Sequence, residues 1–194
     1  MSLDQITIRP AETRDATAVA QVHDRAWRGA YRGIIPGVAL ERMVERRGPR
    51  WWARLIRHQR SVLVLEVHGT IAGYATLGAN RSKTLRVHGE IYELYIDPAY
   101  QGLGFGSRLF NAARERLKAA RLGHFVVWAL EDNASAIGFY QAMGGEPVAH
   151  GVETFGPTQP SVRDSVGGGG TEAAVHLAGQ CRKLAFIWGT GQTR

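Results

Sequence analysis

The amino-acid sequence predicts an α/β domain built around a mixed β-sheet, and three observations support this. Hydrophobic patterns follow the order of one strand, a group of helices and then β-β-β-α-β-α-β-β. The run FVVWAL at residues 125–130 is apolar throughout, which is typical of a strand buried on both faces. A glycine-rich loop at residues 101–106 separates a strand pattern from a long amphipathic helix pattern.

The first half of the chain supplies one strand, three helices and a hairpin. Apolar and polar residues alternate over residues 6–9 and end at Pro10, which predicts a short first strand. Apolar residues at helical spacing predict three helices, over residues 16–26, 38–44 and 50–60. Two β-type runs are joined by the turn His68-Gly69 and predict a hairpin, at residues 61–67 and 70–77.

The second half begins with a strand pattern at residues 90–96 that leads into the glycine loop. Residues 107–121 carry one apolar helical face, and Gly123 follows as a stop signal. After the apolar strand, Asn133 can cap a helix that runs to Met143 before two glycines. Two further strand patterns close the domain, at residues 147–152 and 184–188.

Length and composition favour a single soluble domain spanning residues 1–194. Hydrophobic residues make up 44% of the chain and charged residues 21%, as in ordinary globular proteins. One cysteine, Cys181, leaves no internal disulfide framework and suits a reducing cytoplasm. We expect a cytoplasmic protein without membrane association, because no apolar run approaches a membrane span and the first residues do not resemble a secretory signal.

The net charge of +7 favours anionic partners, of which nucleic acid and a phosphate-bearing coenzyme are two candidates. The arginines are scattered and form no compact basic run with interleaved aromatic residues, so we interpret them mainly as solvated helix faces and consider nucleic acid the weaker candidate. The histidines are far apart in sequence, and no pair has the spacing of metal ligands. We therefore expect no metal.

The loop Gln101-Gly-Leu-Gly-Phe-Gly106 has the composition of an anion site. Glycines let the backbone approach a phosphate and tolerate positive φ, and the first N–H groups of the following helix have no internal partners. Two common phosphate loops are excluded, because position 107 is serine rather than glycine and no lysine follows. The bare loop is also compatible with an ordinary β-to-α turn.

The spacing Q-x-x-G-x-G, satisfied by Gln101, Gly104 and Gly106, resembles the acyl-CoA-binding motif of GNAT superfamily N-acetyltransferases. The resemblance covers residues 6–149 and resumes at 183–189. It implies a mostly antiparallel sheet flanked by helices on both faces. Residues 155–180 are rich in glycine and proline and depart from the family, which predicts a flexible insertion.

The resemblance also implies which residues bind acetyl-CoA. A second family motif, N-x-x-A-x-x-x-Y, matches Asn133, Ala136 and Tyr140, where the asparagine contacts the pantetheine arm and the tyrosine protonates the departing thiolate. The structural alternative is that Asn133 only caps its helix and Tyr140 only packs. The expected cofactor residues are Leu94, Tyr95, Ile96, Gln101, Gly102, Leu103, Gly104, Phe105, Gly106, Ser107, Asn133, Ala136 and Tyr140.

The same strand offers two candidates for a general base, Glu90 and Glu93. They are three residues apart, so the alternation of a regular strand predicts that they face opposite sides of the sheet. By resemblance, Trp27 and Tyr31 lie where the family encloses the acceptor, although core packing is the simpler interpretation of Trp27. A backbone N–H between Leu94 and Ile96 is expected to hold the oxyanion.

We therefore predict an enzyme, an acyltransferase that transfers an acetyl group from acetyl-CoA to a primary amine of a small molecule, peptide or protein. A homodimer is compatible with this prediction. One alternative is an acyl-CoA-binding sensor of the same fold without catalytic activity, and another is a nucleic-acid-binding protein.

Overall fold

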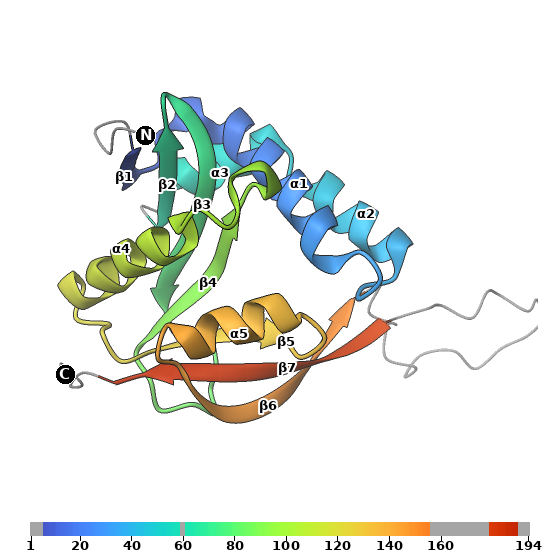
Figure 1. Cartoon of the computed structure of the whole chain (residues 1–194), viewed down its shortest axis with the longest axis vertical. Coiled ribbons are helices and arrows are strands. Elements are labelled where there is room, and N and C mark those ends of the chain that lie inside the picture. Colours follow the sequence, from blue (N-terminus) through green and yellow to red (C-terminus); the bar gives the residue numbers. More distant parts are fainter. Residues whose placement is uncertain (1–5, 59–60, 156–178, 190–194) are drawn as a thin grey trace, which may run out of the picture.

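The computed structural model describes residues 6–58, 61–155 and 179–189. Its centre is a seven-stranded sheet in the order β1-β2-β3-β4-β5-β7-β6, in which every neighbouring pair is antiparallel except β4 and β5 (Figure 1). The strands are β1 (Ile6–Pro10), β2 (Val62–Val67), β3 (Thr70–Ala79), β4 (Gly89–Ile96), β5 (Phe125–Leu130), β6 (Glu146–Phe155) and β7 (Gly179–Trp188).

Helices cover both faces of this sheet, which confirms the predicted fold class. They are α1 (Ala16–Tyr31), α2 (Gly37–Arg46), α3 (Pro49–His58), α4 (Phe105–Ala119) and α5 (Ala134–Ala142), with short 3-10 turns at Thr13–Asp15 and Pro98–Tyr100. On one face, α1 and α3 bury Val19, Val22 and Trp52 against β2 and β3. On the other face, α4 and α5 pack on the sheet centre, where Leu109 and Phe110 are fully buried.

The predicted elements are all present, with shifted ends. Helix α4 begins at Phe105, two residues earlier than its apolar pattern indicated, because Gly104 already serves as its N-cap. The last two strands are longer than predicted and pair with each other along their length. Strand β6 reaches Phe155 and β7 starts at Gly179, so the core of the predicted insertion, residues 156–178, lies outside the described residues.

The two parallel strands, β4 and β5, stay together over only three residue pairs, ending at Ile91 and Val127. Beyond this point the two strands diverge and leave a gap between them. Helix α5 lies in front of β5, on the β5 side of this gap (Figure 1). Strand β4 also carries an irregularity here, because Thr76 of β3 pairs with Glu93 and the next residue, Leu77, pairs with Ile91. Tyr92 is therefore the extra residue of a β-bulge, a feature that re-aims side chains.

Candidate active site

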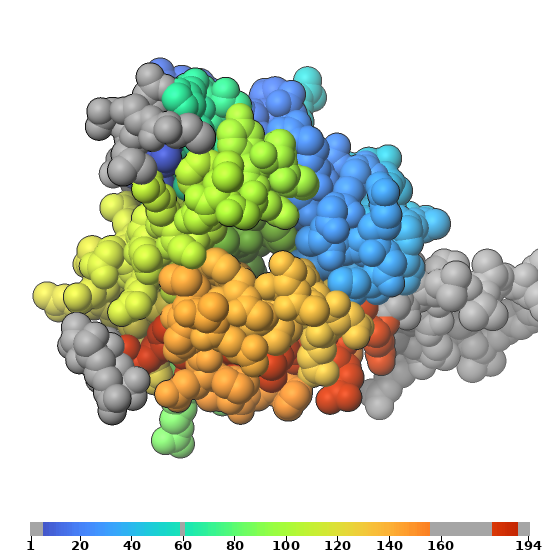
Figure 2. All heavy atoms as spheres, in the orientation of Figure 1, coloured from blue at the N-terminus to red at the C-terminus, as the bar shows by residue number. Residues whose placement is uncertain are grey.

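A cavity of about 760 Å³, here called the first cavity, occupies the gap between the diverging strands. Figure 2 shows the surface hollowed between α1, the loop before α4, and α5. The volume is in the usual range for sites that bind small molecules or cofactors. It is lined by most of the predicted site residues: Tyr31, Glu93, Leu94, Tyr95, Ile96, Gln101, Gly102, Gly104, Gly106, Ser107, Asn133, Ala136 and Tyr140.

The glycine loop forms one end of the first cavity. Gly102 and Gly104 have φ values of 77° and 78°, in the left-handed region that favours glycine, and no atom lies within 4 Å of a Cβ placed on either. Gly106 does not share this conformation. It lies in the first turn of α4, where a Cβ would stand 3.4 Å from Cε2 of Phe139, so it allows close packing. The loop thus presents open backbone at a helix N-terminus.

Two residues of the predicted cofactor set do not line the first cavity with their side chains. Leu103 is 56% exposed on the outside of the loop. Phe105 is buried in the core beneath α4. Of this loop, the lining consists of Gln101, the three glycines and Ser107. The contribution expected from Leu103 and Phe105 is therefore limited to their backbone groups.

Strand β4 turns backbone N–H groups toward the gap. The Asp97 N–H donates to a carbonyl of β3 at 2.9 Å. Because backbone groups alternate sides along a strand, the N–H of Tyr95 also faces β3, and those of Leu94 and Ile96 face the gap. The Ile96 carbonyl, on the same edge, accepts a hydrogen bond from Gln101 Nε2 at 3.0 Å. The expected donor set of Leu94 to Ile96 is thus reduced to its first and last members.

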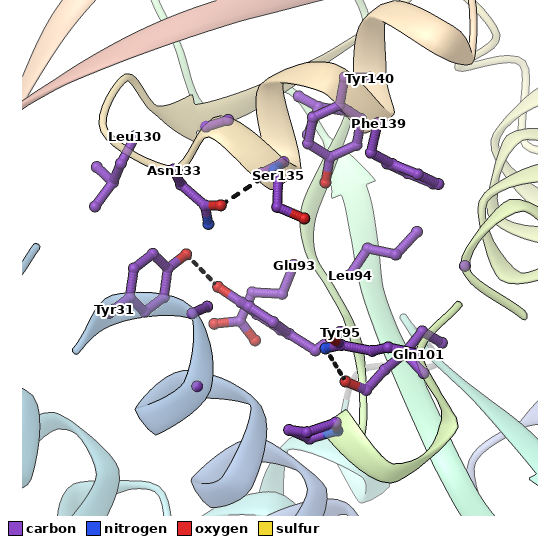
Figure 3. A pocket seen from close by; sticks show the side chains of 18 of the residues that line it. Tyr31, Glu93, Leu94, Tyr95, Gln101, Leu130, Asn133, Ser135, Phe139 and Tyr140 are labelled. Atoms are coloured by element: carbon purple, nitrogen blue, oxygen red, sulfur yellow. Dashed lines mark hydrogen bonds between the residues drawn. The ribbon is translucent and has the colours of Figure 1, made fainter. Parts of the chain in front are cut away.

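Helix α5 brings its polar side chains to the opposite wall. Asn133 caps the helix, because its Oδ1 accepts the Ala136 N–H at 3.1 Å. Tyr140, seven positions later, is buried, and its hydroxyl points into the first cavity (Figure 3). Burial raises the pKa of the Tyr140 hydroxyl. The group is therefore a neutral donor at physiological pH.

A second cavity of about 560 Å³ adjoins the first and shares Tyr31, Glu93 and Tyr95 with it. Three ion pairs line the second cavity and leave its charge balanced: Arg47 with Glu93, Arg81 with Glu90, and Lys183 with Glu153. Four further aromatic residues are part of its lining: Trp27, Trp51, Tyr92 and Trp128.

The prediction that Glu90 and Glu93 face opposite sides of the sheet is wrong. Both carboxylates line the second cavity. The bulge at Tyr92 adds one residue between them, so both side chains point to the same face of the sheet. The alternation of a regular strand does not predict this. Glu90 accepts hydrogen bonds from the backbone N–H and the guanidinium of Arg81, at 2.8 and 2.7 Å. Glu93 lines both cavities and Glu90 only the second.

Glu93 ends a buried chain of hydrogen bonds. Arg47 donates to one carboxylate oxygen, and the Tyr74 hydroxyl donates to the other at 3.4 Å. His23 Nδ1 lies 2.7 Å from the Tyr74 oxygen. Which of these two atoms donates depends on the tautomer of His23, whose other ring nitrogen is Nε2. That atom is buried and has no partner among the described residues, and burial lowers the His23 pKa to about 3.

Burial raises the pKa of the Glu93 carboxyl, and the charge and hydrogen bond of Arg47 oppose that shift. Near Glu93, the Tyr31 and Tyr95 hydroxyls are 2.6 Å apart (Figure 3). Burial raises the pKa of Tyr31 to about 12, so it stays protonated. Trp27 is buried in the cluster beneath α2 and lines the second cavity only.

Comparison with known proteins identifies the family. The model of the acetyltransferase (GNAT) family matches residues 19–145, about two thirds of the chain. The chain belongs to the GNAT family. It is an acetyl-CoA-dependent N-acetyltransferase, as its sequence predicted. The uncharacterized N-acetyltransferase YuaI of Bacillus subtilis is 32% identical over 145 residues, which cover 74% of this chain and 82% of the relative.

Other relatives of this GNAT enzyme have named acceptors. The L-methionine sulfoximine/L-methionine sulfone acetyltransferase of Salmonella typhimurium is 28% identical over 72% of this chain and 79% of the relative. Among solved structures, the PaiA N-acetyltransferase of Thermoplasma acidophilum in complex with coenzyme A superposes with a TM-score of 0.68 at 17% identity, covering 94% of this chain and 99% of that one. The latter similarity supports the fold.

Several residues of the GNAT site carry no local sequence signal. Arg47 follows α2, Tyr74 lies in the middle of β3, and Trp128 belongs to an apolar strand. Only the tertiary fold brings them to β4. Among the described residues, no group of three or more metal-ligating side chains could hold an ion, and no helix is long and apolar enough to cross a membrane.

Proposed function

We propose that the first cavity binds acetyl-CoA and that the acetyl group is transferred there to a primary amine of a small molecule, peptide or protein that enters through the second cavity. One observation carries the proposal. A single cavity joins the glycine loop, the inward-pointing Tyr140 hydroxyl and the Glu93 carboxylate, and this carboxylate also lines the neighbouring cavity.

The glycine loop would hold the diphosphate of coenzyme A. Open backbone at Gly102 and Gly104 and the N-terminus of α4 favour an anion at this end of the cavity. The pantetheine arm would lie in the gap between β4 and β5, beside the Asn133 amide. The Asn133 oxygen already caps α5, so the amide nitrogen is the group left for the cofactor.

Glu93 would act as the general base. An alkyl ammonium with a pKa of about 10.4 must lose a proton before its nitrogen can attack a thioester. Glu93 lies at the junction of the two cavities, where the amine and the thioester would meet. Both oxygens of Glu90 are engaged by Arg81, which favours a supporting role for Glu90. A water molecule between Glu93 and the amine is compatible with this assignment.

As the amine attacks, negative charge develops on the carbonyl oxygen, and the gap-facing N–H groups of Leu94 and Ile96 are positioned to stabilise it. Losing one such donor typically costs about 3 kcal/mol of transition-state stabilisation. When the C–N bond has formed and the C–S bond breaks, Tyr140 would give its proton to the departing thiolate. Its raised pKa keeps that proton in place until the thiolate appears.

A silent acyl-CoA sensor of the same fold is the alternative, and the Tyr140 hydroxyl, which points into the cavity that Glu93 also lines, argues against it. The acceptor is less constrained by homology. One relative is named N-alpha-acetyltransferase RimI, from Mycobacterium tuberculosis, and another acts on L-methionine sulfoximine and L-methionine sulfone. The first name specifies an α-amino group, and the second gives two amino-acid derivatives.

The test combines coenzyme binding with amine-dependent turnover. At a hundredfold excess over its Kd, coenzyme A should stabilise the protein by about 2.7 kcal/mol, and NAD and ATP should do much less because the loop matches neither of their motifs. Amines should accelerate release of free thiol from acetyl-CoA. No thermal shift with coenzyme A would overturn the binding proposal. Binding without acceleration by any amine would favour the sensor.

A further inference from the structure

Arg47 is the feature of the second cavity that the acetyl-transfer mechanism leaves unexplained. It follows the last residue of α2, and its side chain is 28% exposed at the cavity wall. Its guanidinium lies over the rings of Trp27 and Trp51, at 5.4 and 5.0 Å from their centroids. Cation–π contacts of this kind restrict the position of the guanidinium. The bond to Glu93 uses one of five N–H donors, so donors remain for a ligand.

The position of Arg47 is unfavourable for a simple amine. An amine that approaches Glu93 arrives as an ammonium, and Arg47 is already hydrogen-bonded to that carboxylate. Two cations would then share one buried anion, which weakens binding of the second. The other two carboxylates of the cavity, Glu90 and Glu153, are each paired with a cation of their own. No described carboxylate of the cavity is left over for the incoming charge.

An acceptor that carries its own carboxylate removes this conflict. A guanidinium binds a carboxylate with two parallel N–H donors, so Arg47 can hold the acceptor while Glu93 faces its amine. Because Arg47 and Glu93 are bonded to each other, a ligand that contacts both must carry its two charges close together. An α-amino acid, or a close homologue with one more carbon, has this spacing. A peptide N-terminus has the amine but an uncharged amide in place of the carboxylate.

We propose that the acceptor is a free amino acid with an apolar or aromatic side chain, bound through its carboxylate by Arg47. The inference rests on the proposed acetyl transfer and names its substrate class. The side chain would lie against the apolar wall beside Arg47, which α2 and α3 form with Met43, Trp51 and Leu55. Recognition by the carboxylate excludes peptides and proteins as the preferred acceptors.

The experiment compares matched acceptors by thiol release from acetyl-CoA. One set is L-tryptophan, L-tryptophanamide and tryptamine, and a second set is L-methionine with its amide and its decarboxylated amine. The free acid should have a kcat/KM at least about tenfold above those of its amide and its decarboxylated amine, which corresponds to about 1.4 kcal/mol. At about pH 8, amine protonation alone favours the amide over the free acid. The α-amine of the amide resembles that of a peptide, with a pKa of about 7.7–8.0, so more of it is in the reactive neutral form.

The variant Arg47→Gln should reduce the ratio of acid to amide to within about threefold, because it removes the charge but keeps an N–H donor. Arg46→Gln is the matched control, since the neighbouring arginine is exposed and outside both cavities, and it should keep the wild-type ratio. The coenzyme A thermal shift verifies that each variant is folded. If Arg47→Gln does not fold, the wild-type ratios decide alone.

Equal or better use of the amides by the wild-type enzyme would overturn the inference and favour a peptide terminus, while acetyl transfer itself would stand. A ratio unchanged in Arg47→Gln would also overturn it. If no amine of either kind accelerates thiol release, the proposed function fails instead, so the two failures are distinguishable.

Discussion

At the scale of single residues, Glu93 is the best-supported side chain of the site. One oxygen is held by Arg47 and the other by Tyr74, which His23 orients from behind. Burial raises the carboxyl pKa, although Arg47 limits the shift. A base whose pKa moves toward the working pH is better matched to removing a proton. The buried chain therefore positions Glu93 and adjusts its basicity together.

Replacing Glu93 by Gln tests this role. We expect a loss of about 10²-fold in kcat/KM near neutral pH, the lower end of the range for general acid–base catalysis. A general base must be deprotonated to act, so if Glu93 has this role the wild-type rate should fall as the pH drops through its raised pKa, and the Glu93-dependent part of this fall should be absent in the variant. The deficit should shrink at high pH, where the amine is already free.

Glu90→Gln is the comparison, because Glu90 lies in the second cavity and its oxygens are engaged by Arg81. Its loss should be clearly smaller. If the two variants lose activity equally, or Glu90→Gln loses more, Glu93 is not the base.

How much of the site the sequence predicts depends on how far apart the residues are along the chain. Asn133 and Tyr140 are on one helix at a fixed offset, so the pattern places them together, and both line the first cavity. Arg47 and Tyr74 reach Glu93 from α2 and β3, and no short-range pattern encodes those contacts. Local periodicity predicts the former pair only.

At the scale of elements, the junction of the loop and α4 determines the character of the first cavity. Gly104 caps α4 in a left-handed conformation, which a β-branched residue adopts only with strain. Sequence predicted this junction because glycine spacing is local. It did not predict the bulge at Tyr92, which depends on how β3 pairs with β4 and reverses the expected orientation of Glu90 relative to Glu93.

The variant Gly104→Val tests the loop. It should weaken coenzyme A binding by about tenfold or more, because a side chain would occupy the open backbone surface where the phosphates approach. It should also lower stability by roughly 1–2 kcal/mol, from left-handed strain in a branched residue. Isothermal titration with coenzyme A and thermal unfolding measure the two effects separately.

Gly69→Val is the matched control for backbone strain. Gly69 has the same φ of 78°, also has no atom within 4 Å of an added Cβ, and lies in the turn between β2 and β3. It should lose similar stability and keep its coenzyme affinity. Unchanged affinity in Gly104→Val would mean that the loop serves only as a turn.

At the scale of the whole molecule, the sheet consists of two halves that meet at the site. Strands β1 to β4 form one half and β5, β7 and β6 the other, and only three residue pairs join β4 to β5. The sequence predicted the order of the elements and the family motifs. The divergence of two neighbouring strands depends on packing across the whole sheet, so no segment of sequence revealed it.

The two halves contribute opposite parts of the proposed chemistry. Strand β4 brings Glu93 and the oxyanion donors, and α5 brings Tyr140 from across the gap. The central claim is therefore that a hydroxyl from one half completes a reaction begun on the other. Removing that single oxygen leaves the ring, its packing and the glycine loop in place.

The most direct test is turnover by Tyr140→Phe, measured as thiol release from acetyl-CoA across the pH range, with Tyr100→Phe as a control outside the lining of both cavities. We expect turnover to fall by about 10²-fold or more, since the thiolate loses its proton donor, while coenzyme A affinity changes little. The control should retain wild-type turnover. Full turnover by Tyr140→Phe at every pH would contradict the account.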